Sequence, residues 1–147
     1  MDKDALTRIA EALERMSPPP QRTALDDAPA YVWQGGRLMP ASGFRPVSIG
    51  LLAGVDMQKA AILENSRRLA AGHAAHDILL WGARGTGKSA LVKSTTAAVQ
   101  AGGGALRLVE ASCDDMETLP DLFALLARQS VPTLVFIDDI GFEQGDP

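Results

Sequence analysis

Residues 82–89 read GARGTGKS and carry the strongest signal in the sequence. They match the pattern G-x-x-x-x-G-K-[ST] and lie between an apolar run and a helical run. Glycines let backbone N–H groups surround a phosphate without side-chain clashes, and the helix that follows adds its positive N-terminal end to the same anion. We therefore expect a phosphate-binding Walker A loop, in which Lys88 reaches the β- and γ-phosphates of a nucleotide and Ser89 ligates Mg²⁺.

Arg84 and Thr86 vary freely in such loops, so we expect only backbone donation from them. The loop residues expected to contact the nucleotide are Gly82, Ala83, Arg84, Gly85, Thr86, Gly87, Lys88, Ser89 and Ala90.

A second motif lies fifty positions after Lys88, where residues 134–139 read LVFIDD and place two carboxylates at the end of an apolar strand. This is a Walker B pattern. A carboxylate at this place can hold Mg²⁺, and its neighbour can polarise the water that attacks a phosphate. We assign Asp138 to the metal and Asp139 to the water, so Lys88 and Asp139 are the expected catalytic residues.

Strands and helices alternate along the second two thirds of the chain. Short apolar runs predict strands over residues 77–81, 106–110 and 133–138. Helical periodicity predicts helices that end near residue 71 and that span residues 88–100 and 118–129. This alternation predicts an α/β fold with a parallel sheet and flanking helices, of the P-loop type.

The helix over residues 118–129 carries two more specific expectations. Thr118 and Asp121 stand at capping-box spacing, which places Thr118 at the N-cap. The side chains expected to face the core are Leu119, Leu122, Phe123 and Leu126.

The N-terminal part is organised differently. Residues 1–16 place Leu6, Ile9, Leu13 and Met16 at 3-4-3 spacing, which predicts a short amphipathic helix that docks on its own protein or on a partner. Residues 17–46 hold six of the nine prolines and are expected to form a linker. Within it, residues 31–33 and 37–39 flank Gln34-Gly35-Gly36, which favours a small hairpin. The core domain is then expected over residues 47–147.

Composition sets limits on the function. The 147 residues carry a net charge of −4, with 46% apolar and 22% charged residues, which argues against a polyanion-binding surface over the whole chain but leaves local nucleic-acid contact open. The single cysteine, Cys113, cannot form an internal disulfide, and neither a signal peptide nor a membrane-spanning run is visible. A cytoplasmic location is therefore expected.

Six stretches in order resemble a known family. They are GVDMQK (54–59), EN (64–65), GTGKSALVK (85–93), LRLVE (106–110), LPDL (119–122) and DDIGFEQG (138–145). Over about residues 30–146 the chain resembles an AAA+ ATPase core, and more narrowly the bacterial family of domains of unknown function numbered 815. The resemblance implies ATP and Mg²⁺ as ligands and makes Gly54 and Val55 candidate contacts of the adenine base. Most AAA+ proteins have glutamate where Asp139 stands.

The resemblance also implies a function for a longer protein. We expect the chain to be an N-terminal part, truncated after the Walker B strand, with residues 141–147 forming a loop cut midway. The full-length protein is expected to hydrolyse ATP and remodel a macromolecular partner, with a homo-oligomeric ring as its assembly, whereas hydrolysis by these 147 residues alone is doubtful. Two alternatives remain open: a small-molecule P-loop kinase, and a non-hydrolysing fragment that binds a nucleotide or a partner.

Overall fold

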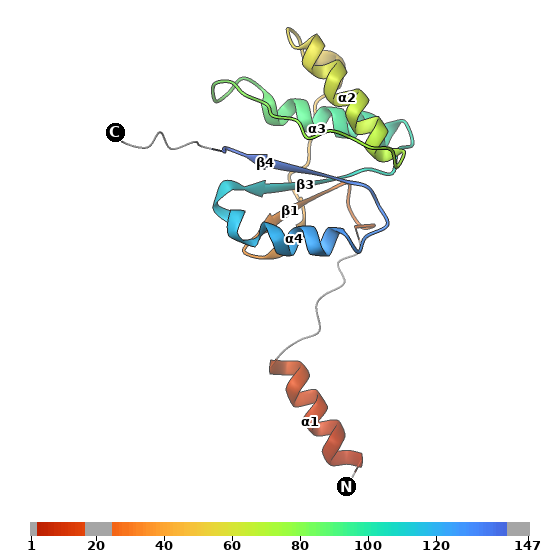
Figure 1. The fold of residues 1–147 in the computed structure, drawn as a ribbon, viewed down its shortest axis with the longest axis vertical. Helices are drawn as coiled ribbons and strands as arrows, with labels where there is room; N and C mark the ends of the chain where they lie inside the picture. Colours follow the sequence, from red (N-terminus) through yellow and green to blue (C-terminus); the bar gives the residue numbers. More distant parts are fainter. Residues whose placement is uncertain (1–2, 17–24, 141–147) are drawn as a thin grey trace, which may run out of the picture.

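The computed structural model describes residues 3–16 and 25–140. Helix α1 (Lys3–Met16) stands apart from an α/β body that contains all the other elements (Figure 1). In chain order these are β1 (Ala30–Gln34), β2 (Arg37–Pro40), the 3-10 turn η1 (Ile49–Leu51), α2 (Asp56–Ala70), α3 (Lys88–Ala101), β3 (Arg107–Ser112), the 3-10 segment η2 (Cys113–Thr118), α4 (Leu119–Leu126) and β4 (Thr133–Asp138).

The body is built on one four-stranded sheet in the order β2-β1-β3-β4. Strands β1, β3 and β4 are parallel, and β2 pairs antiparallel with β1 through the Gly35-Gly36 turn. Both glycines adopt the positive φ angles that the sequence suggested. The expected hairpin is therefore confirmed, but it belongs to the main sheet. Within the stretch 17–46 that we expected to be a linker, Leu25, β1 and β2 contribute buried side chains to the core.

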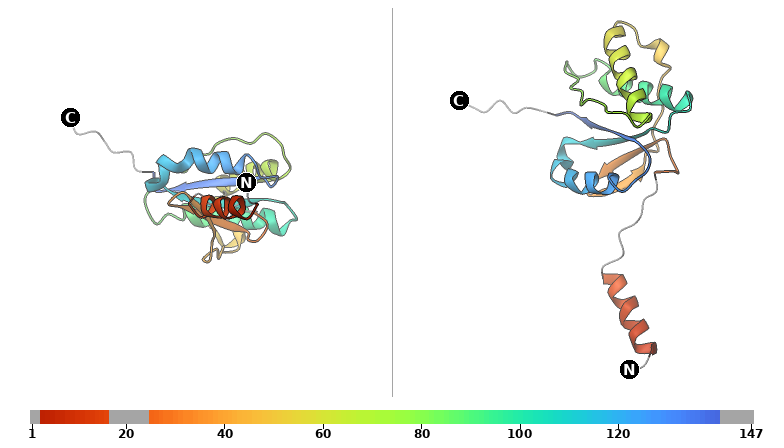
Figure 2. Two further views of the ribbon diagram at one scale, coloured as in Figure 1. Left: turned by 90° about the horizontal axis from the view of Figure 1, so that it is seen from below. Right: turned by 45° about the vertical axis from the view of Figure 1, so that its right-hand side comes forward.

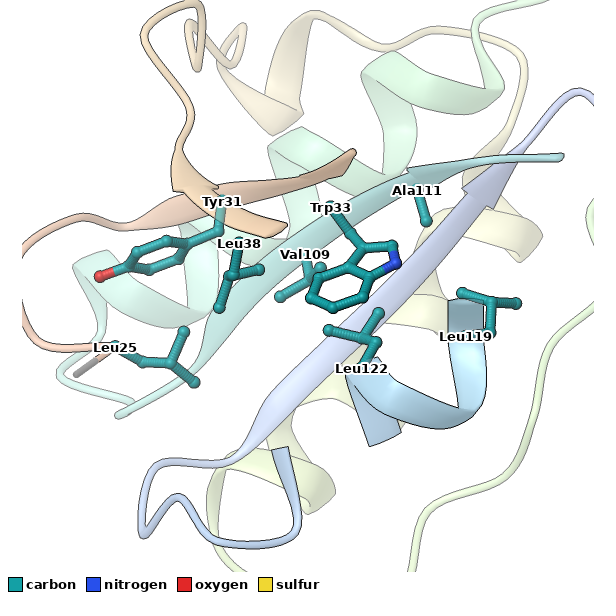
Figure 3. Close-up of a cluster of buried hydrophobic side chains, with 8 residues drawn as sticks. All are labelled: Leu25, Tyr31, Trp33, Leu38, Val109, Ala111, Leu119 and Leu122. Carbon is teal, nitrogen blue, oxygen red and sulfur yellow. The ribbon is translucent and has the colours of Figure 1, made fainter. Parts of the chain in front are cut away.

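Helices cover both faces of the sheet, with α2 and α3 on one side and α4 on the other (Figures 1 and 2). Alternate residues of the parallel strands point to opposite faces, as the two-residue period of a strand requires. On the α3 face, Ala30, Val92 and Leu108 are buried together. On the α4 face a larger cluster surrounds the Trp33 indole (Figure 3). Its buried members are Leu25, Tyr31, Trp33, Leu38, Val109, Ala111, Leu119 and Leu122.

Helix α3 is fixed to the sheet and to α2. The Lys93 ammonium lies 3.1 Å from a Glu110 carboxylate oxygen, which ties the helix to β3 through a half-buried ion pair. Two serines, Ser66 on α2 and Ser94 on α3, are buried to 1% exposure, and among the described residues their hydroxyls have no hydrogen-bond partner. A buried hydroxyl without a partner destabilises a fold, because it loses its bonds to water on folding.

Ser94→Ala should therefore raise the free energy of unfolding, by about 1 kcal/mol, since it removes the unpaired hydroxyl and adds helix propensity. Thr96→Val is the matched control on the same helix, because the buried Thr96 hydroxyl does donate to the Val92 carbonyl oxygen at 2.9 Å. Urea unfolding followed by circular dichroism should give Ser94→Ala a higher unfolding midpoint than the parent. The midpoint of Thr96→Val should equal that of the parent or lie below it. A lower midpoint for Ser94→Ala would contradict the assignment of an unpaired hydroxyl.

The expected strand over residues 77–81 does not form. The described sheet gives this segment no neighbouring strand, and β4 remains an edge strand. Leu79 and Trp81 are exposed, and only Leu80 packs against the cluster on the α3 face. The apolar run was a sound reason to expect burial, but a strand also needs a hydrogen-bonding partner, which a local pattern does not reveal.

The helix over residues 118–129 differs from expectation in its length, in its capping and in the position of Phe123. Residues 113–118 form η2, so α4 spans only Leu119–Leu126; Thr118 is its N-cap, as expected, but the Thr118 side chain makes no capping hydrogen bond. Instead the Thr118 hydroxyl accepts from Trp33 Nε1 at 2.9 Å and donates to the Asp115 carbonyl oxygen at 3.0 Å. The buried indole N–H needs a partner, and it takes the hydroxyl that would have capped the helix. Phe123 is half exposed rather than in the core.

Helix α1 confirms the N-terminal amphipathic helix. Its apolar side chains Leu6, Ile9, Leu13 and Met16 are exposed, so the described residues do not show what this face docks against. Across the described residues, no helix has the length and apolar character to cross a membrane. The loop expected over residues 141–147 lies outside the described residues.

Candidate functional site

The loop between residues 82 and 87 has the backbone geometry that its glycines predict. Gly85 and Gly87 have φ angles of 79° and 87°, in the left-handed region that other residues rarely adopt. The Thr86 hydroxyl donates to the Ala83 carbonyl oxygen at 2.8 Å and closes the turn. The loop thus curves at the entrance to α3.

The loop ends where the first turn of α3 begins. Gly87 is the N-cap, no side chain caps the helix, and the first turn contains no acidic residue. The first-turn N–H groups of a helix have no partner within the helix, and they carry its partial positive charge. This end of α3 therefore offers donors and positive potential to an anion.

Lys88 and Ser89 begin α3 and face the loop and the end of β4. The Lys88 ammonium donates to the Gly82 and Ala83 carbonyl oxygens at 2.8 and 2.9 Å, so it lies across the loop. The Ser89 hydroxyl donates to Asp138 Oδ2 at 2.9 Å. The two residues that the sequence assigned to Mg²⁺ are therefore in contact, although 49 positions separate them.

Asp139 lies directly after β4 and has a φ angle of 56°, in the left-handed region that Asp tolerates better than most residues. Its own N–H donates to Asp138 Oδ1 at 2.9 Å. Its carboxylate accepts two bonds from Arg84, from Nε at 3.2 Å and from Nη2 at 2.7 Å. The glycine-rich loop with the start of α3 and the turn after β4 are thus joined twice, by Ser89–Asp138 and by Arg84–Asp139.

A cleft of about 1090 Å³ separates the segment 77–82 from β4 and reaches these groups. Gly82, Arg84, Lys88, Asp138 and Asp139 all line it. The proposed adenine contacts, Gly54 and Val55, do not line it. They follow a segment that is held by Lys59, whose ammonium donates to the Leu52 carbonyl oxygen at 2.7 Å.

The donor set fits a hard cation that is shared with a phosphate. Mg²⁺ takes oxygen ligands and keeps several waters, so one hydroxyl and one carboxylate suffice when phosphate oxygens complete the shell. Ser89 Oγ and Asp138 Oδ2 already lie side by side. Within the described residues, no group of three or more His, Cys, Asp or Glu side chains forms a self-sufficient metal site.

Comparison with known proteins places the chain in a family. The model of the family described as "Protein of unknown function (DUF815)" matches residues 26–147. The chain belongs to the DUF815 family. No curated protein and no solved structure matches it significantly. The narrower family resemblance seen in the sequence is thereby confirmed, and the matched region includes every residue of the loop and of the turn after β4.

One feature of the site in this DUF815 chain was not expected from its sequence. Arg84 was given only a backbone role, yet its guanidinium forms a two-bond ion pair with Asp139. The only signal in the sequence was a basic residue inside a glycine-rich loop and an extra acid in the Walker B motif. Fifty-five positions separate the pair, so the fold was needed to bring them together.

Proposed function

We propose that this DUF815 chain is an ATP-binding P-loop protein of the AAA+ type, with Mg²⁺ bound beside the phosphates. The observation that supports it best is the 2.9 Å contact between Ser89 Oγ and Asp138 Oδ2. It joins the end of a glycine-rich loop to the end of a parallel strand, where a phosphate-bound Mg²⁺ would need its two protein ligands.

Each site residue has a distinct role in this proposal. The backbone N–H groups of residues 82–90 and the first turn of α3 surround the phosphates, and Lys88 exchanges its loop carbonyl partners for β- and γ-phosphate oxygens. Ser89 and Asp138 hold Mg²⁺, which neutralises phosphate charge and supplies Lewis-acid polarisation. Asp139 orients the attacking water and polarises it. Gly54 and Val55 remain the proposed contacts of the adenine base.

The wider activity follows from the AAA+ resemblance. We infer that ATP hydrolysis by the whole protein remodels a macromolecular partner, with a homo-oligomeric ring as the working assembly.

Thermal unfolding of the purified chain with and without Mg²⁺ and ATP tests nucleotide binding. A ligand at a hundred times its dissociation constant adds about 2.7 kcal/mol to the stability of the folded state, so the melting temperature should rise by several degrees. A melt with ADP and Mg²⁺ shows how much of the stabilisation comes from the γ-phosphate. A melt with ATP and EDTA shows how much comes from the metal. An unchanged melt at millimolar Mg²⁺ and ATP would exclude the proposed function.

Asp138→Asn should remove most of the gain that Mg²⁺ brings to ATP binding, because a neutral amide is a far weaker Mg²⁺ ligand than a carboxylate. We expect the affinity ratio between ATP with Mg²⁺ and ATP with EDTA to fall about tenfold, or about 1.4 kcal/mol. Asp121→Asn is the matched control, since Asp121 is an exposed acid on α4, on the opposite face of the sheet. Calorimetric titration of the two variants measures this ratio. An unchanged ratio in Asp138→Asn would show that Asp138 is not a Mg²⁺ ligand.

A further inference from the structure

The pair between Arg84 and Asp139 uses both carboxylate oxygens of the residue that is proposed to polarise water. While the pair holds, each Asp139 oxygen accepts a hydrogen bond from the guanidinium, so fewer of its lone pairs are available to orient a water molecule.

The surroundings of the pair allow Arg84 to exchange Asp139 for another anion. The Arg84 and Asp139 side chains are 85% and 54% exposed, so neither is held by packing and water screens their attraction. A phosphate offers a guanidinium the same two-pronged geometry as a carboxylate, with a larger charge. A phosphate that arrives within reach of Arg84 would therefore compete well for it.

The position of the pair indicates which phosphate that is. Arg84 lies in the loop, and its guanidinium reaches across to the turn after β4, beside Asp138. In the proposed function, Asp139 polarises the water that attacks the terminal phosphate, so the group that contacts Asp139 lies next to that phosphate. ADP has no phosphate at this place.

We propose that Arg84 is the residue that distinguishes ATP from ADP in this site. On ATP binding its guanidinium leaves Asp139 for the γ-phosphate, and the freed carboxylate becomes available to the attacking water. With ADP the pair to Asp139 persists. This inference rests on the proposed ATP-binding function and assigns to the Arg84 side chain a specificity role in it.

The test is a double-mutant cycle with the full chain, titrated calorimetrically with the β,γ-imido analogue of ATP and with ADP, both with Mg²⁺. Arg84→Ala should weaken the analogue about tenfold and ADP less than about twofold. Asp139→Asn keeps the left-handed backbone, which Asn tolerates, and frees Arg84 from its competitor. It should tighten the analogue several-fold when Arg84 is present and clearly less when Arg84 is alanine.

Two further variants serve as controls. Arg37→Ala removes the same charge from β2, at the far edge of the sheet, and should leave both affinities unchanged. Arg84→Lys retains the charge without the two-pronged geometry. Its affinity for the analogue should therefore lie between those of the parent and of Arg84→Ala. It also provides a second measurement if the alanine variant folds poorly.

The outcomes separate this inference from the proposed function. If the parent chain binds neither nucleotide, both are overturned. If it binds both nucleotides and Arg84→Ala weakens them equally, the discrimination by Arg84 is overturned while ATP binding stands. Equal tightening by Asp139→Asn in both backgrounds would show simple relief of charge repulsion, and would likewise overturn the exchange.

Discussion

Lys88→Ala should weaken binding of ATP with Mg²⁺ about a hundredfold, or about 2.7 kcal/mol. The Lys88 ammonium already lies across the loop, with two carbonyl oxygens at 2.8 and 2.9 Å, so phosphate oxygens in the loop would meet it at hydrogen-bond distance. A charged hydrogen bond contributes about 1.5–3 kcal/mol, and a neutral methyl group offers none. Calorimetric or fluorescence titration measures the change directly.

The control for this variant is straightforward because Lys88 is the first residue of α3 and its hydrogen bonds to the loop are solvent-exposed. The melt of Lys88→Ala without nucleotide should match that of the parent, which separates lost binding from lost folding. Arg37→Ala, on β2 at the far edge of the sheet, removes the same formal charge away from the loop. Equal affinity in Lys88→Ala and the parent would contradict the phosphate-binding role of the loop.

Leu122→Ala should lower the free energy of unfolding by about 2–5 kcal/mol, the range for a large aliphatic side chain deleted from a core. Leu122 on α4 is 0% exposed and belongs to the cluster around Trp33 (Figure 3). Protein interiors are close-packed, so the deleted side chain leaves a cavity. The neighbouring residue on the same helix, Phe123, is 50% exposed. Phe123→Ala is therefore the matched control.

Urea unfolding followed by circular dichroism gives both free energies under the same conditions. We expect Phe123→Ala to cost clearly less than Leu122→Ala even though it removes more atoms, because stability depends on the area withdrawn from water. Equal losses would mean that α4 buries a different face from the one described. The comparison also tests the correction of Phe123 from a core position to a half-exposed one.

Local patterns predicted most of the helices and strands. Strands β3 and β4, helices α2 and α3, and the hairpin at Gly35-Gly36 all lie within a few residues of where periodicity and turn residues placed them. The proximity of Ser89 and Asp138 also followed from the sequence, because both residues were assigned to the same Mg²⁺.

The features that the sequence did not predict depend on pairing between distant segments. Parallel pairing of β1 with β3 joins Tyr31 to Val109, and no local pattern carries that register. The segment 77–81 has the composition of a strand but no partner in the described sheet. Thr118 and Arg84 each have a partner far along the chain, Trp33 and Asp139, that changes their role.

The left-handed backbone of Asp139 bears on how this site can evolve. A φ angle of 56° is more accessible to Asp, Asn and Gly than to a longer side chain such as glutamate. A change of Asp139 to glutamate would therefore need a compensating change in the turn after β4. We therefore expect Asp139 and the conformation of this turn to be retained or changed together during evolution.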